Sequence, residues 1–196
     1  MINPNKPDYS TISIFNIIII SEAMVLLIST IWMAAVKLNL ANSFHFNRYC
    51  LYYGISTGLL IAITSKILYV LGDKFNIRLF QSLKNIYADE IYNNFKKFSL
   101  NQIFMISLIS GFCEEIFFRG VLQEEIGIIP CNLIFAFLHA PKFSFWLLFI
   151  LTLLAGLLFS YLKIHLHSLW PPIIAHSLNN FISFLFLKYI VTIKKN

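Results

Sequence analysis

The chain is organised around residues Gly111 to Gln123, GFCEEIFFRGVLQ, which carry two adjacent carboxylates and an arginine inside an otherwise apolar segment. An ionised side chain in hydrocarbon costs at least about 2.5 kcal/mol, so charges at such a place indicate a functional site. Glu115 and Arg119 are four residues apart and share one face of a helix, whereas Glu114 is turned away by about 100°. We therefore expect Arg119 to neutralise Glu115 and Glu114 to remain free for chemistry.

The composition is that of a polytopic membrane protein with a single domain. The chain has 196 residues, of which 12% are charged, and its mean hydropathy is +0.74. Soluble domains average about 25% charged residues. The net charge of +6 comes from cations in short runs beside apolar segments. The positive-inside rule explains this distribution, so we expect the lipid bilayer as a partner and no nucleic acid.

The three cysteines, Cys50, Cys113 and Cys131, are odd in number and lack C-x-x-C spacing. This usage favours neither a disulfide framework nor a zinc knuckle. Cys113 is next to two carboxylates, which disfavour a thiolate nucleophile there. We expect all three to act as small apolar residues.

Long apolar segments predict an all-α bundle of about six transmembrane helices. The expected spans are 12–36, 49–72, 100–122, 130–139 or a longer helix from about 126, 143–162, and 171 to about 190. Ser99 suits the N-cap of the third span, and Pro171-Pro172 suit the start of the sixth. Residues 73–99 mix cations with apolar side chains and predict an interfacial amphipathic helix on the membrane.

This order divides the single membrane domain into two parts, 1–99 with two spans and the interfacial helix, and 100–196 with the helices of the proposed site. Six spans put both termini on one side of the membrane. Most cations outside the spans are on that side, against Lys37, Arg48 and Lys163 on the other. We therefore expect both termini to be cytoplasmic.

Several polar residues receive structural rather than functional expectations. Within the spans, Glu22 is expected to face neighbouring helices, and Lys66 to extend towards the polar side near Asp73. Residues 163–170 are expected to form a loop. The histidines expected in loops at the interface are His45, His165 and His167.

Three groups downstream of the acidic pair are possible partners for Glu114. His139 ends the fourth apolar segment, and His176 and Asn180 are one turn apart near the start of the sixth. Each histidine alone would by default be structural. Together, a buried carboxylate, a histidine on a second helix and a His-Asn pair on a third are the groups needed to hydrolyse an amide.

The residues divide by chemistry into two roles. A carboxylate in a low-dielectric site is a stronger base, so Glu114 and His139 can hold and deprotonate one water. His176 and Asn180, at i and i+4, share a helix face and can donate two hydrogen bonds to one developing oxyanion, each often worth about 3 kcal/mol. Glu115 is then the structural partner of Arg119.

In chain order, Glu114-Glu115-x-x-x-Arg119, Phe135-x-x-x-His139 and His176-x-x-x-Asn180 resemble the motifs of the CAAX protease and bacteriocin-processing family, also called the Abi family. The resemblance implies a glutamate-type intramembrane endopeptidase, similar to the Ras-converting prenyl endopeptidase of eukaryotes. It assigns water activation to Glu114 and His139, the oxyanion site to His176 and Asn180, and support of these residues to Glu115, Arg119 and Phe135. The chain has fewer spans than the eukaryotic enzyme, so a prenylated substrate does not follow.

Two other functions fit the same residues. Since His139, His176 and a glutamate are possible zinc ligands, a metal-dependent protease is one, although H-E-x-x-H is absent and Asn180 is a poor ligand; we expect no cofactor. A non-catalytic protein of the same fold, such as a bacteriocin-immunity factor or a scaffold, is the other. A transporter is disfavoured because we find neither repeats nor paired broken helices.

The helix lengths place the site in the outer half of the bilayer. Glu114 is about 21 Å from the start of its helix at Leu100, and His176 is close to the outer start of its own. His139 fits this depth poorly, at about 18 Å from the outer side if its helix begins at Ile126. Frequent Ile, Asn, Lys and Phe suit an AT-rich genome, and hence a bacterial cytoplasmic membrane and a membrane-embedded or membrane-associated peptide substrate.

Overall fold

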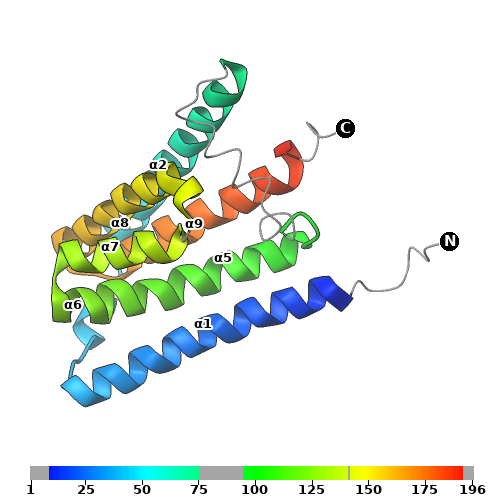
Figure 1. Ribbon diagram of the computed structural model, residues 1–196. Helices are drawn as coiled ribbons and strands as arrows, with labels where there is room; N and C mark the ends of the chain where they lie inside the picture. The colour runs from blue at the N-terminus through cyan, green and yellow to red at the C-terminus, as the bar shows by residue number, and fades with distance from the viewer. Residues whose placement is uncertain (1–8, 76–94, 141, 192–196) are drawn as a thin grey trace.

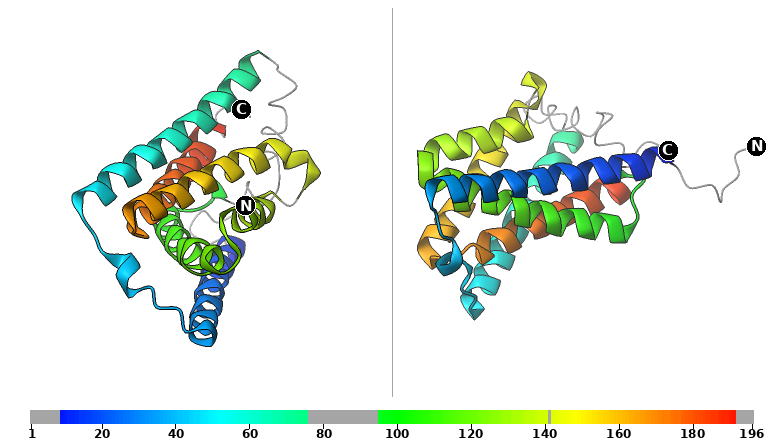
Figure 2. Two further views of the ribbon diagram at one scale, coloured as in Figure 1. Left: turned by 90° about the vertical axis from the view of Figure 1, so that its left-hand side faces the viewer. Right: turned by 90° about the horizontal axis from the view of Figure 1, so that it is seen from below.

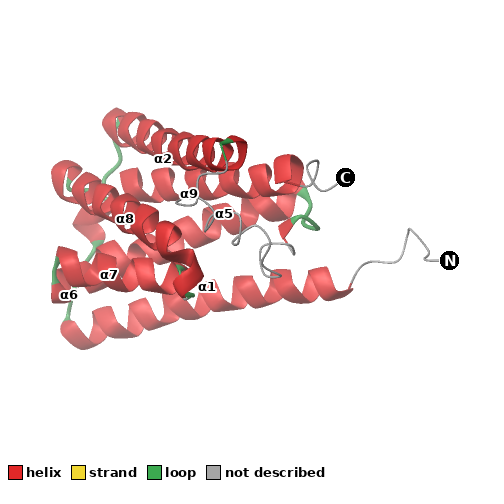
Figure 3. Ribbon diagram, turned by 45° about the horizontal axis from the view of Figure 1, so that its top comes forward, coloured by secondary structure: helices red, strands yellow, loops and turns green. Residues whose placement is uncertain are grey.

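The computed structural model describes residues 9–75, 95–140 and 142–191, and the elements of this part of the chain are all helical (Figures 1 and 3). In chain order they are α1 (Tyr9–Val36), the 3-10 turn η1 (Ala41–Phe44), α2 (Arg48–Lys74), α5 (Leu100–Glu115), the π-helical segment η3 (Ile116–Leu122), α6 (Gln123–Ile126), α7 (Ile128–His139), the 3-10 turn η4 (Phe143–Phe145), α8 (Trp146–Leu166), α9 (Trp170–Phe186) and the π-helical segment η5 (Leu187–Val191). The predicted all-α class is confirmed.

Three of these helices are long and apolar enough to cross a membrane: Ile14–Val36, Arg48–Lys74 and Trp146–Leu166. α7 is a shorter apolar helix. Many large apolar side chains of α1 and α2 are exposed on the outside of the bundle, as lipid contact requires. The protein is an integral membrane helix bundle, and the number of crossings stays a prediction.

Local sequence signals explain where several helices begin. The Ser99 side chain accepts from the backbone N–H of Gln102, and the Gln102 side chain accepts from the backbone N–H of Ser99, a reciprocal capping box at the start of α5. The Asn47 side chain caps α2. Pro171 and Pro172 occupy the first turn of α9, as predicted.

Two predicted boundaries are wrong. α8 continues to Leu166, so the predicted loop begins later and His165 is helical. Lys163 pairs with Glu124 and the His165 ring stacks on Tyr161 at 5.3 Å, contacts that stabilise this last turn. At the other end, 143–145 form a 3-10 turn before α8. His167 closes the helix in a left-handed conformation, with φ 48°.

The predicted interfacial helix at 73–99 falls mostly outside the described residues. Its first two residues, Asp73 and Lys74, belong to α2 instead. The segment 76–94 is outside the described residues, so the rest of that expectation stays a prediction. Lys188 of η5 holds the end of the segment, because its ammonium donates to the backbone carbonyls of Lys96 at 3.0 Å and Phe98 at 2.7 Å.

The depth of His139 follows from where the third helix ends. The predicted end at Leu122 is wrong, because η3 and α6 carry the helix on to Ile126, where Gly127 reverses the chain with φ +85°. Glu114 is therefore about 18 Å from the end of this helix at Ile126, at 1.5 Å per residue, and His139 returns by nearly the same distance along α7. The reversal at Gly127 thus turns α7 back along η3 and α6, which brings His139 to the level of Glu114.

Helix α9 is at the centre of the bundle and packs against α2, α5 and α8 (Figure 2). α1 contacts α5 and η3, on the opposite side of the bundle from α2. Small residues allow the close contacts: a Cβ on Gly58 of α2 would be 2.8 Å from the carbonyl oxygen of Ala175 in α9. Close approach through small residues is typical of membrane helix pairs.

We expect Gly111→Ala to destabilise the protein, because α5 leaves no room for a side chain there. A Cβ on Gly111 would contact Ser177 Oγ and lie 2.8 Å from the Ser177 backbone nitrogen, so α9 must shift. Such overpacking costs about 1–3 kcal/mol. Thermal unfolding in detergent can be followed with a thiol-reactive fluorophore, since Cys50, Cys113 and Cys131 are all free and buried.

Gly120→Ala is the matched control for this prediction. Its Cβ would meet the flexible end of Leu40, at 2.7 Å from Cδ1, and that side chain can move. A melting temperature lowered equally by both substitutions would contradict the proposed importance of the α5–α9 contact.

Candidate active site

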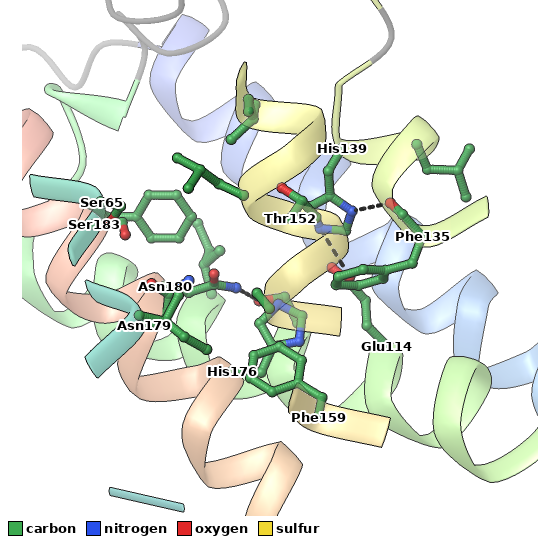
Figure 4. A pocket seen from close by; sticks show the side chains of 18 of the residues that line it. Ser65, Glu114, Phe135, His139, Thr152, Phe159, His176, Asn179, Asn180 and Ser183 are labelled. Atoms are coloured by element: carbon green, nitrogen blue, oxygen red, sulfur yellow. Dashed lines mark hydrogen bonds and ion pairs between the residues drawn. The ribbon is translucent and has the colours of Figure 1, made fainter. Parts of the chain in front are cut away.

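A cavity of about 400 Å³ lies among helices α1, α2, α5, α7, α8 and α9 (Figure 4). Five of the predicted site residues line it: Glu114, Phe135, His139, His176 and Asn180. The other two predicted residues, Glu115 and Arg119, are fully buried beside it. The structure thus brings all seven into one region from four elements.

Glu114 and His139 contact each other at one end of the cavity (Figure 4). Glu114 Oε2 is 3.3 Å from His139 Nε2. The contact has ion-pair distance without hydrogen-bond alignment, and within the described chain Glu114 Oε2 has no hydrogen-bond partner. On its other side, His139 Nδ1 is 2.8 Å from the carbonyl oxygen of Phe135.

These contacts fix the protonation pattern of the pair. A carbonyl oxygen only accepts, so His139 Nδ1 carries a proton and a neutral ring presents the lone pair of Nε2 to Glu114. The lone pair of Nε2 and that of a Glu114 carboxylate oxygen would repel each other. One proton shared by the carboxyl and the imidazole removes this repulsion. Such a pair can take a proton from a water placed beside both groups and return it later.

Glu115 connects the acidic stretch to α9. Its Oε1 accepts from Arg119 Nη1 at 3.0 Å and from His176 Nδ1 at 2.7 Å. The predicted Glu115–Arg119 ion pair is therefore present in the structure, and it has a third member that the sequence pattern did not indicate. Because Nδ1 is occupied, His176 reaches the cavity through Nε2.

The Arg119 guanidinium is enclosed completely. Beyond Glu115, its Nη2 donates to Asn132 Oδ1 at 3.1 Å and to the Gly156 carbonyl oxygen at 3.2 Å. Phe135 lies over it with 4.2 Å from the guanidinium carbon to the ring centroid. Gly156 cannot gain a Cβ without contacting Nη2, at 2.9 Å. Gly156 thus leaves the space that Arg119 occupies.

Aromatic rings hold the two histidines. Phe135 contacts His139 with centroids 4.3 Å apart and His176 edge-on at 5.8 Å, while Phe159 stacks on His176 at 5.3 Å. Asn180 Nδ2 donates to Ser110 Oγ at 3.0 Å, leaving its second amide proton available. Phe159 and Ser110 had no signal in the sequence, since both are ordinary residues of apolar helices.

Glu114, His139 and His176 also form the group among the described residues that is best suited to hold a metal ion. One ligand atom from each lies within 4.8 Å of the others. In both histidines Nδ1 contacts an oxygen acceptor, and Nε2 is the ring nitrogen left for a cation beside Glu114. Metal-bound histidines share that arrangement, so the residues fit a divalent cation such as zinc.

Two charged residues of the N-terminal helices also line the cavity, Glu22 of α1 and Lys66 of α2. Glu22 is buried, and in the described part of the molecule its Oε2 has no hydrogen-bond partner. The expectation that Glu22 faces neighbouring helices is met, but it faces the cavity as well. A lone charge in an apolar helix was the available signal, and it did not reveal the direction of the side chain.

Comparison with known proteins agrees with this geometry. Residues 96–182 match the family model described as type II CAAX prenyl endopeptidase Rce1-like, a range that includes all three motifs. The chain is 34% identical over 128 residues to the uncharacterized protein YpbD of Bacillus subtilis (strain 168), an alignment covering 64% of this chain and 62% of YpbD. The chain therefore spans less than two thirds of the length of this relative.

No solved structure gives a significant match to this chain. The family match rests on the segment that holds the acidic pair, both histidines and Asn180. Residues 96–182 are thus similar to the Rce1-like family of type II CAAX prenyl endopeptidases, in agreement with the resemblance inferred from the three motifs.

Proposed function

We propose that the protein is an intramembrane endopeptidase of the glutamic type. The observation that carries this proposal is the meeting of Glu114, His139 and His176 from three helices around one point of a cavity. Two groups that can accept a proton, Glu114 and His139, a hydrogen-bond donor, His176, and a space for substrate are then within reach of one another. The family match supports CAAX-type protease activity in a membrane protein.

In the proposed reaction, a water beside both Glu114 and His139 attacks the scissile carbonyl carbon. Its proton passes to the Glu114–His139 pair as the C–O bond forms. The oxyanion of the tetrahedral intermediate accepts hydrogen bonds from His176 Nε2 and the free amide proton of Asn180. The C–N bond then breaks, and the pair returns the proton to the leaving nitrogen.

Glu115 makes the role of His176 possible. A neutral His176 with a proton on Nδ1 has only a lone pair at Nε2, so donation to an oxyanion requires the imidazolium form. The Glu115 carboxylate, 2.7 Å from Nδ1, stabilises that cation. Arg119 donates to the same oxygen and orients Glu115, so Glu115 and Arg119 act as positioning residues.

The setting that we propose is a bacterial cytoplasmic membrane with both termini in the cytoplasm. α1 and α5 begin, and α2 and η5 end, at one end of the bundle (Figure 1), which is compatible with this orientation. The relative in Bacillus subtilis supports a bacterial setting. The proposed substrate is a peptide or the anchor segment of a membrane protein, entering a cavity with mainly apolar walls.

A metal-dependent peptidase is the second candidate, favoured by the clustering of possible ligand atoms of Glu114, His139 and His176. These three residues would hold the cation, which would supply Lewis-acid activation when bound. In that case the Phe135 carbonyl oxygen would orient His139, and the Glu115 carboxylate would orient His176. Hydrogen-bond acceptors behind metal-bound histidines have this role.

We expect Glu114→Gln to abolish peptide cleavage, because the amide cannot take a proton from water. General-base removal lowers rates by about 10²–10⁴-fold. The measurement compares the membrane proteomes of the variant and parent strains, in which the uncleaved substrate should accumulate in the variant. Glu125→Gln, a change of an exposed residue of α6 three positions beyond η3, is the matched control and should resemble the parent.

The non-catalytic alternative makes the opposite prediction for the same strains. A Glu114→Gln or His139→Ala protein that is folded, present at the parental level and fully able to restore the cellular phenotype would support an immunity factor or scaffold. Such a result would contradict the peptidase proposal.

Metal removal separates the two catalytic candidates. We expect the purified protein to contain less than stoichiometric zinc by elemental analysis and to keep its cleavage rate after dialysis against a strong chelator, since the glutamate–histidine pair activates water without a cation. A rate that falls at least 10-fold with the chelator and recovers on addition of zinc would establish the metal-dependent mechanism.

A further inference from the structure

A cation lies inside the cavity at a distance from the catalytic groups. Lys66 projects from α2, and its ammonium donates to Ser183 Oγ of α9 at 2.5 Å and to Ser65 Oγ at 3.2 Å. The ring of Phe186 is 5.9 Å away. The expectation that Lys66 extends towards Asp73 is wrong, because the serine of α9 holds the side chain within the cavity wall.

The surroundings of Lys66 are incomplete for a cation. Among the described residues, its polar partners are the two serine hydroxyls, and none of its partners is a carboxylate. An ammonium has three donors, so one N–H remains for a further acceptor. A charge in hydrocarbon is unfavourable unless an opposite charge or several hydrogen bonds compensate it. The site is therefore arranged to receive an anion.

The distance between this cation and the catalytic groups follows from positions along helix α9. His176, Asn180 and Ser183 are at i, i+4 and i+7, so they share one face. Seven residues of helix rise about 10.5 Å. Figure 4 shows Ser65 and Ser183 at the opposite end of the cavity from Glu114 and His139, with Asn179 and Asn180 between them.

The ligand that suits this arrangement is the carboxylate of a peptide. An extended peptide advances about 3.3 Å per residue, so a group bound at Lys66 is roughly three residues from a carbonyl bound at His176. Asn179 lines the cavity between the two positions, where its amide can meet the peptide backbone. The cavity of about 400 Å³ has room for a few residues of chain.

We propose that Lys66 and Ser183 form a carboxylate-binding subsite of the catalytic cavity and select substrates with an acidic group about three residues from the scissile bond. The spacing rests on the proposed peptidase function, whereas the subsite itself requires only the cavity. The acidic group is either an Asp or Glu side chain or the C-terminal carboxylate of the substrate. Both present the same chemistry to the ammonium, and peptides can distinguish them.

The experiment measures binding of three peptides of one apolar sequence, each labelled with an uncharged fluorophore, to the protein in detergent. The first peptide has an internal Gln and an amidated C-terminus, the second has Glu in place of Gln, and the third has Gln with a free C-terminal carboxylate. The protein carries Glu114→Gln so that no peptide is cleaved. We expect at least one acidic peptide to bind about 10-fold more tightly than the neutral one, as a charge-assisted hydrogen bond implies.

Lys66→Met tests the residue itself. We expect it to remove the preference for the acidic peptide and to leave the affinity for the neutral peptide unchanged. The variant should fold, because it replaces a charge in an apolar helix by an apolar side chain of similar length. Lys66→Arg should keep the preference. Lys74→Met, a change of an exposed lysine on the same helix, is the matched control and should behave as the parent.

Equal binding of all three peptides, no binding of any, or a preference that survives Lys66→Met would overturn the subsite. A second measurement separates this outcome from failure of the proposed function. Protein with Glu114 intact is incubated with the same peptides, and products are mapped by mass spectrometry. Acid-selective binding without cleavage would overturn the peptidase and keep the subsite, while cleavage without acid selectivity would do the reverse.

Discussion

The structure depends on one carboxylate oxygen. Glu115 Oε1 accepts from Arg119 of η3 and from His176 of α9, so a single buried anion joins the acidic stretch to the central helix. Removal of any member would leave an uncompensated charge or an unheld imidazole in a low-dielectric interior, where such groups are unfavourable by several kcal/mol. The ion pair therefore has two effects. It makes the charges tolerable in the membrane, and it fixes which nitrogen of His176 faces the cavity.

The helix itself separates the two adjacent glutamates. α5 ends at Glu115, and the π-helical segment that follows carries Arg119. Wide turns of this kind are frequent at functional sites, since the extra residue per turn changes the direction of the side chains that follow. Here Glu114 points into the cavity while Glu115 points towards Arg119. Adjacent residues of the same type thus acquire different tasks from their direction alone.

The features that depend on a single helix could be predicted from the sequence. Apolar length, the cap at Ser99 and the i, i+4 spacing of Glu115 and Arg119 predicted the class, most helix starts and the ion pair. The contact of His176 with Glu115, the Asn132 bond to Arg119 and the direction of Lys66 depend on how helices far apart in the chain are packed, which periodicity does not encode. The predicted depths of Glu114 and His139 disagreed because the third helix continues through η3 and α6 to Ile126 instead of ending at Leu122.

The cavity is polar along its length although its walls are mainly apolar. Glu22 and Glu114 line it together with Lys66, whose ammonium is held by Ser183, two helical turns of α9 beyond His176. Charges are screened poorly between apolar walls, so the electric field of these residues acts on any peptide that enters the cavity. A peptide with an acidic group near one end would be oriented by that field before its backbone met His176. Because α1 and α2 provide Glu22 and Lys66, the helices outside the family match contribute to the charge of the cavity and not merely to its enclosure.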